Sequence, residues 1–144
     1  MLKAGSTILS KNLFKLTIGG GLVFWATTIA TSLLPIAADY RVARWSAETV
    51  WVGSLPAGLL IGFFVSFFLL RFFDKIPTKN SILKSVILSI IALVIGTILL
   101  EAPASFGTSD ALYYFFFGTM LNVPRFLFVG VAIGYLYKKL YGQA

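Results

Sequence analysis

The sequence predicts an all-α integral membrane protein, a bundle of four transmembrane helices with both termini on the same side. Of its 144 residues, 58% are hydrophobic and only 12% are charged, about half the charged share of a typical soluble protein. The apolar residues gather in four long runs, and nearly all charges fall between them. Because a helix pairs its own backbone groups, it is the structure that such a run adopts in lipid.

The first two expected spans cover residues 16–38 and 49–72. A helix needs about 20 residues to cross roughly 30 Å of hydrocarbon, and both runs are that long. The end of the first run, at 35–38, weakly resembles a signal-peptide cleavage site. The run is longer than the apolar region of such a peptide, so we expect a retained helix. Three glycines at 19–21 indicate a hinge or a close helix contact.

The last two expected spans cover residues 82–101 and 112–137. Lys84 stands near the start of the third span, and we expect its long side chain to extend towards water. Arg125 interrupts the otherwise uncharged fourth run. The remaining residues are too few for a soluble domain, so residues 1–144 form a single transmembrane domain.

The basic residues are divided unequally between the two sides that these spans define. Nine fall on one side and two on the other, namely Lys3, Lys11, Lys15, Arg71, Lys75, Lys79, Lys84, Lys138 and Lys139 against Arg41 and Arg44. By the positive-inside rule both termini are cytoplasmic. We expect a multi-pass protein of a prokaryotic plasma membrane or, alternatively, of an organelle inner membrane. Topology and attraction to anionic lipid account for this charge, so nucleic acid is not an expected partner.

The two halves of the chain resemble each other at an offset of 68 residues. This offset aligns three pairs, Pro35 with Pro103, Pro56 with Pro124, and Gly62 with Gly130. One interpretation is a duplication, in which 1–73 and 74–144 are tandem helical hairpins related by an axis along the membrane normal. The other is coincidence, because membrane spans use few residue types.

Small residues recur at every fourth position in the second and fourth spans. They are Ser54, Gly58, Gly62 and Ser66, and then Gly130 and Gly134. Such stripes predict close helix contacts and carry no chemistry. Four spans are too few to bury every small face internally, so we expect assembly with other membrane subunits or into a homo-oligomer.

The most concentrated polar feature is the Asn122–Arg125 segment of the fourth span. Asn122 and Arg125 share a helix face. An amide and a guanidinium there are suited to an anion, a carboxylate or a lipid phosphate. The favoured alternative is an ion pair between Arg125 and Glu101 or Asp110, because buried charges are usually paired.

Prolines lie within two of the spans, at Pro56 and Pro124. Because proline lacks an N–H group, Pro124 deprives the carbonyl of Met120 of its helical partner. Pro56 has no charge nearby, so the prolines are predicted to be architectural kinks in both halves.

The chain contains no cysteine and no histidine, which removes thiol nucleophiles and the commonest zinc and copper ligands. We expect no metal and no cofactor. The sequence gives little support for an enzyme, because the acidic residues that are candidates for general acid–base catalysis lie in loops outside any evident pocket.

The function predicted first is a non-enzymatic subunit or assembly component of a larger membrane complex, surrounded by lipid and other subunits. The alternative is a small oligomeric transporter or channel, in which Arg125 and Asn122 select an anionic solute or lipid headgroup.

Overall fold

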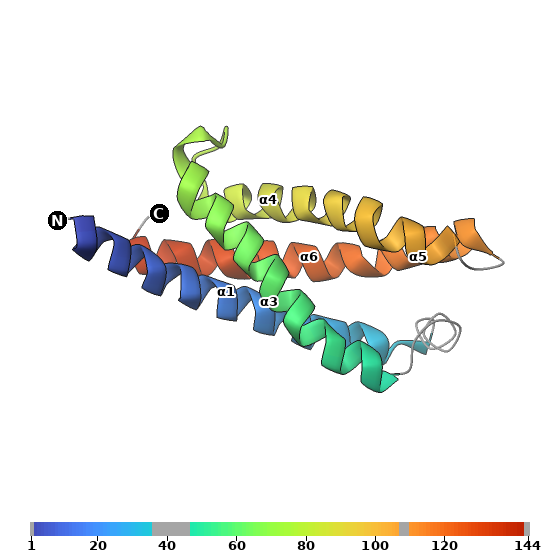
Figure 1. Cartoon of the computed structure of the whole chain (residues 1–144). Coiled ribbons are helices and arrows are strands. Elements are labelled where there is room, and N and C mark those ends of the chain that lie inside the picture. Colours follow the sequence, from blue (N-terminus) through green and yellow to red (C-terminus); the bar gives the residue numbers. More distant parts are fainter. Residues whose placement is uncertain (1, 36–46, 107–109, 143–144) are drawn as a thin grey trace.

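A computed structural model describes residues 2–35, 47–106 and 110–142, with the side chains of 10–35, 49–100, 102–103, 106 and 110–142. Every element in these ranges is helical (Figure 1). In chain order they are α1 (Leu2–Ser32), α3 (Ala47–Phe72), η1 (Phe73–Lys75), α4 (Ser81–Gly96), η2 (Thr97–Glu101), α5 (Ala102–Phe106) and α6 (Ala111–Tyr141).

Four of these helical stretches are long and apolar enough to cross a membrane, which indicates a multi-pass membrane protein. They are Ser10–Ser32, Thr49–Lys75, Ser81–Leu100 and Ala111–Tyr141. The predicted all-helical chain with four such helices is confirmed. The first stretch begins earlier than predicted and its helix ends at Ser32, while residues 36–38 lie outside the described part.

The helices pack as two hairpins. Helix α1 packs mainly on α3, and α4 mainly on α6. The hairpins meet chiefly where α1 contacts α6, whereas α3 and α4 share a smaller interface. Figure 1 shows α3 close to α4 near their connection and diverging from it towards the opposite end.

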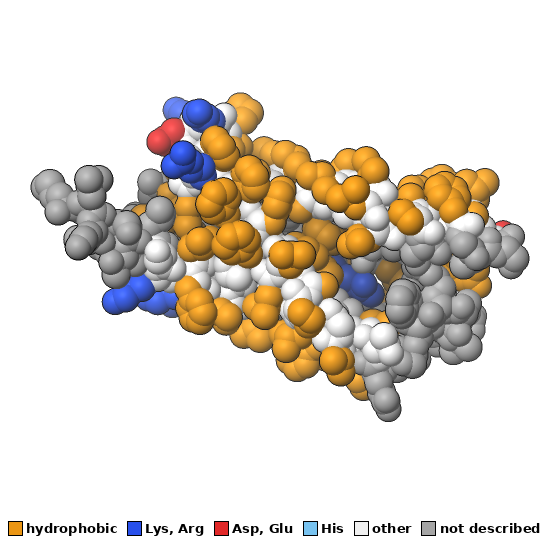
Figure 2. Space-filling model, in the orientation of Figure 1, with side chains coloured by type: hydrophobic (Ala, Val, Ile, Leu, Met, Phe, Trp, Pro, Cys, Tyr) orange, Lys and Arg blue, Asp and Glu red, His pale blue; other side chains and the backbone are white. Residues whose placement is uncertain are grey.

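One end of the bundle gathers the basic residues. The start of α1, the end of α6 and the α3–α4 connection lie together there (Figure 1), and Figure 2 shows Lys and Arg side chains clustered at this end. We call it the basic end. The most completely buried apolar residues lie in the half of the bundle nearer to it, namely Leu16, Val65, Leu69, Val129 and Ile133.

Local sequence explains where several helices begin, change or end. The side chain of Asn80 accepts a 2.9 Å hydrogen bond from the Ile82 N–H and so caps α4. Pro103 cannot donate to the Leu99 carbonyl, and the helix there widens into the π-helical η2. Helix α6 ends at Gly142, whose φ of 63° is readily adopted only by glycine.

Within each hairpin the two helices touch at glycines. A Cβ added at Gly62 of α3 would lie 2.7 Å from the Thr17 carbonyl oxygen and 3.0 Å from the Gly21 nitrogen of α1. A Cβ at Gly130 of α6 would lie 2.8 Å from the Val86 Cα of α4. These contacts involve backbone, so the helices approach closely only because these positions lack a side chain.

The small-residue stripes are therefore used inside the bundle. Gly58 and Gly62 face α1, while Gly130 and Gly134 face α4. The premise that four spans are too few to bury every small face does not hold for these stripes, because the two hairpin crossings use them. Assembly with other subunits or into a homo-oligomer stays a prediction.

Lys84 also differs from its prediction. Only 5% of its surface is exposed. Its Nζ donates a hydrogen bond to the Phe73 carbonyl and lies 3.7 Å from the centroid of the Phe73 ring. The nearby carbonyl and aromatic face replace the water that this ammonium was expected to reach.

Candidate functional site

Arg125 lies half-buried in α6, and its hydrogen bonds include two to neutral side chains. Its Nε donates a 3.0 Å hydrogen bond to Oγ1 of Thr31 on α1, and its Nη1 donates a 3.0 Å bond to Oδ1 of Asn122. The Thr31 hydroxyl in turn donates to the Thr28 carbonyl at 3.1 Å. The structure thus brings Asn122 and Arg125 together and adds Thr31, from the other hairpin.

The two predicted acidic partners of Arg125 have different outcomes. Asp110 is exposed and immediately precedes α6, which is 15 residues before Arg125 and places it about 22 Å away along the helix axis. The prediction of a direct ion pair between Arg125 and Asp110 is therefore wrong, because the two side chains together cannot span that distance. Glu101 falls in η2, but its side chain lies outside the described residues.

Arg125 lines a recess of about 320 Å³ between three helices. Phe24 and Thr28 of α1 form one wall, and Ser54 and Ala57 are among the α3 residues of another. Hydroxyl groups and a cation therefore gather in one recess between apolar helices. Figure 2 shows a hollow on one face of the molecule in which basic atoms are visible between apolar side chains.

A second recess, of about 170 Å³, adjoins the first. The two share Phe24 and Ala57, and the second is also lined by Asn122 of α6 and by Gly96 and Thr97 at the junction of α4 and η2. The π-helical turn thus contributes directly to the site, as such turns often do.

A third recess, of about 300 Å³, continues between α3 and α4 and shares Ile61, Gly96 and Leu100 with the second. Its other lining side chains include Leu60, Phe64, Ile95 and Leu99. We refer to the three adjoining recesses together as the α3–α4 groove. It is polar where Arg125 lies and apolar at the other end.

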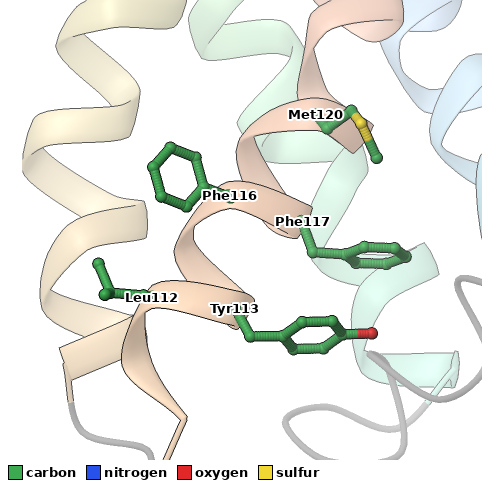
Figure 3. A pocket seen from close by; sticks show the side chains of 5 residues that line it. All are labelled: Leu112, Tyr113, Phe116, Phe117 and Met120. Atoms are coloured by element: carbon green, nitrogen blue, oxygen red, sulfur yellow. The ribbon is translucent and has the colours of Figure 1, made fainter.

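A separate shallow recess of about 370 Å³ lies along the outer face of α6, near the helix start. It is lined by Leu112, Tyr113, Phe116, Phe117 and Met120 (Figure 3). Figure 3 shows Leu112 and Phe116 directed to one side of the helix, and Tyr113 and Phe117 to the other. Tyr113 is the lining residue of a type that is enriched in the headgroup zone of a bilayer.

At the basic end, polar and aromatic side chains connect all four helical stretches. Phe73, after α3, stacks on Tyr137 at 4.5 Å, and Tyr137 stacks on Tyr141 at 4.5 Å. Asn12 of α1 donates a 2.8 Å hydrogen bond to the Tyr141 hydroxyl, while Lys84 of α4 contacts Phe73. This cluster was not predicted from the sequence, although a lysine next to an apolar span and two tyrosines one turn apart indicated it.

The predicted packing residues lie at helix contacts. Ser54, Gly58, Gly62 and Ser66 are buried along the inner face of α3. Pro56 and Pro124 lie inside continuous helices, α3 and α6. Within the described residues, no group of three or more acidic side chains lies close enough together to hold a metal ion.

Comparisons with protein-family models, with curated proteins and with solved structures found no match to this chain.

Proposed function

We propose that this protein is a small, non-enzymatic membrane transporter or channel that recognises the anionic group of a solute or a lipid headgroup. The single observation that carries the proposal is the Arg125 guanidinium, which is oriented by Thr31 and Asn122 and lines a recess between α1, α3 and α6. Ionisable residues within spans are costly and commonly serve function.

The chemistry of the site suits an oxoanion. A guanidinium offers five N–H donors in a plane and remains charged at any physiological pH. Asn122 accepts the Arg125 bond through Oδ1, so its Nδ2 group is the donor that remains for a ligand in the adjoining recess. Two donors of this kind match a phosphate or a carboxylate.

The proposal is tested by replacing Arg125 in the full-length protein reconstituted into proteoliposomes. We expect Arg125→Gln to reduce binding or flux of inorganic phosphate and of a fluorescent phosphatidylglycerol by roughly tenfold to hundredfold, the effect of losing a charge-assisted hydrogen bond. Lys138→Gln, which removes an exposed charge at the basic end, is the matched control and is expected to leave both unchanged.

Equal flux in Arg125→Gln and the unsubstituted protein would exclude Arg125 from the site. A lower midpoint of thermal unfolding with unchanged ligand binding would assign Arg125 a purely structural role, such as an ion pair with Glu101. Thermal unfolding in detergent separates these outcomes from loss of binding.

We also infer that the basic end faces the cytoplasm, so that both termini are cytoplasmic and the Arg125 recess lies in the opposite half of the bundle. The concentration of Lys and Arg at that end supports this orientation (Figure 2). The membrane that we propose is a prokaryotic plasma membrane or, alternatively, an organelle inner membrane. Modification of single cysteines introduced at Lys79 and Asp110 by an impermeant reagent tests it, because only Asp110→Cys should react from outside.

Duplication of a helical hairpin is the origin that we propose for the fold. The contact between Gly21 and Gly62 in the first hairpin and the contact between Ser89 and Gly130 in the second join positions that differ by 68 residues in both helices. The groove repeats this relation, because Ser54 and Ala57 line it at the positions equivalent to Asn122 and Arg125.

A role as a subunit of a larger complex is the second candidate function. The small-residue stripes no longer favour it, because they are used within the bundle. The aromatic recess on the outer face of α6 does favour it, since a partner helix or a second copy of the chain fits such a surface. Gentle purification followed by mass spectrometry tests this candidate, and the absence of stoichiometric partners or of a homo-oligomer would contradict it.

A further inference from the structure

The α3–α4 groove changes character along its length. At one end Arg125 provides a cation, and the Thr28 and Ser54 hydroxyl groups beside it donate to carbonyls of their own helices. At the other end the groove is lined by apolar side chains such as Phe64 and Ile95. A ligand complementary to the whole groove has an anionic group at one end and hydrocarbon at the other.

The apolar end opens sideways, between two helices that face the surrounding lipid. Leu60 of α3 is 70% exposed and Leu99 is 65% exposed, although both line the recess. Because α3 and α4 diverge here (Figure 1), a hydrocarbon chain can enter from the bilayer without crossing water. Between the two ends lies the smallest recess, of about 170 Å³, which favours one chain over two.

We propose that the ligand is an anionic amphiphile with a single hydrocarbon chain. Its anionic group hydrogen-bonds to Arg125 and Asn122, and its chain lies along the α3–α4 groove against Ile61 and Phe64. This inference rests on the proposed function, since it uses the same anion site. It adds that the ligand comes from the bilayer, because a free anion leaves the apolar end of the groove unused.

Three probes that differ in one feature each test the inference on the unsubstituted, full-length protein in phosphatidylcholine nanodiscs. Lysophosphatidic acid has the charge and the chain, glycerol 3-phosphate has the same charged group without a chain, and lysophosphatidylcholine has the chain without net charge. Native mass spectrometry measures the bound fraction. We expect lysophosphatidic acid to bind at least about tenfold more tightly than either of the others.

Each other result overturns a defined part. Equal binding of glycerol 3-phosphate would overturn the role of the chain and leave the proposed anion site intact. Equal binding of lysophosphatidylcholine would overturn the role of the charge. If no anionic probe binds, both the inference and the proposed function are overturned.

A pair of variants locates the chain within the groove. Gly96 lines both the second and the third recess, and a Cβ added there would meet only Phe126, at 3.9 Å. Gly96→Leu therefore fills the groove without forcing the helices apart. It should weaken lysophosphatidic acid binding by about tenfold and weaken glycerol 3-phosphate binding less, because only lysophosphatidic acid has a chain to displace. Val94→Phe, which adds bulk to the 52% exposed Val94 on the same helix outside the groove, should change neither.

Unchanged lysophosphatidic acid binding in a folded Gly96→Leu protein would overturn the placement of the chain. A loss of binding in Val94→Phe as large as in Gly96→Leu would do the same, because it would show that bulk anywhere on α4 has this effect.

Discussion

The α1–α3 and α4–α6 hairpins cross in the same register but use different residues at equivalent positions. At the crossing, Gly21 of the first hairpin corresponds to Ser89 of the second, whose hydroxyl donates a 2.6 Å hydrogen bond to the Phe126 carbonyl. Near the basic end, buried Leu16 corresponds to buried Lys84. Both pairs differ by 68 residues, and in both the second hairpin has the polar residue.

The same contrast holds at the groove, where Ala57 of the first hairpin corresponds to Arg125 of the second. Close approach of two helices therefore requires only small residues, whereas the guanidinium and the amide of the candidate site both belong to the second hairpin. The two hairpins share a backbone arrangement but differ in side chains. The residues that the helix crossing requires can therefore be distinguished from those that form the candidate site.

The largest expected effect tests whether the two crossings are equivalent. Gly62→Ala and Gly130→Ala each place a Cβ within 3.0 Å of backbone atoms of the facing helix. We expect both to lower the free energy of unfolding by about 3 kcal/mol, the upper part of the overpacking range. Denaturation in mixed micelles measures this change.

Gly53→Ala is the matched control, because a Cβ there meets no atom within 4 Å, and it should change the free energy by less than about 0.5 kcal/mol. A large change in the free energy of unfolding in only one of the two glycine variants would show that the two hairpin crossings are not equivalent.

A smaller effect is expected when Lys84 is converted to the residue of the first hairpin. Lys84→Leu removes the hydrogen bond to the Phe73 carbonyl and the cation–π contact. We expect it to lower the free energy of unfolding by about 1–2 kcal/mol. The same denaturation assay measures this change, with Lys79→Leu as the exposed control. A Lys84→Leu protein with a higher free energy of unfolding than the unsubstituted protein would show that leucine packs as well at this position in the second hairpin as in the first.

The smallest expected effect concerns the hydroxyl at the second crossing. Ser89→Ala removes the hydrogen bond to Phe126, and bonds of this kind between membrane helices contribute about 0.6 kcal/mol. Ser85, one turn earlier, has a buried hydroxyl without a hydrogen-bond partner among the described residues, so Ser85→Ala should be neutral or stabilising. If both variants behave alike in the denaturation assay, the Ser89 bond adds nothing to a crossing that glycine alone supports.

The candidate site was predictable only in part. The three-residue spacing of Asn122 and Arg125 on one helix is local, and it predicted that they share a face, as their hydrogen bond requires. Thr31 is 94 residues away from Arg125 in the chain, and nothing in either segment specifies that α1 lies beside α6. The suggested Asp110 partner failed for a different reason, since about four turns of one continuous helix separate the two side chains.

Hydrophobic run length was sufficient to predict four helices, because each run must pair its own backbone groups and does so independently of its neighbours. Helix arrangement depends on pairwise contacts between distant segments, and these decided that the glycine stripes face inwards, that Lys84 is buried, and that α3 diverges from α4. That divergence opens the part of the groove that α3 and α4 line together. Composition and periodicity constrain single helices, whereas a site formed by three or four of them exists only once they pack.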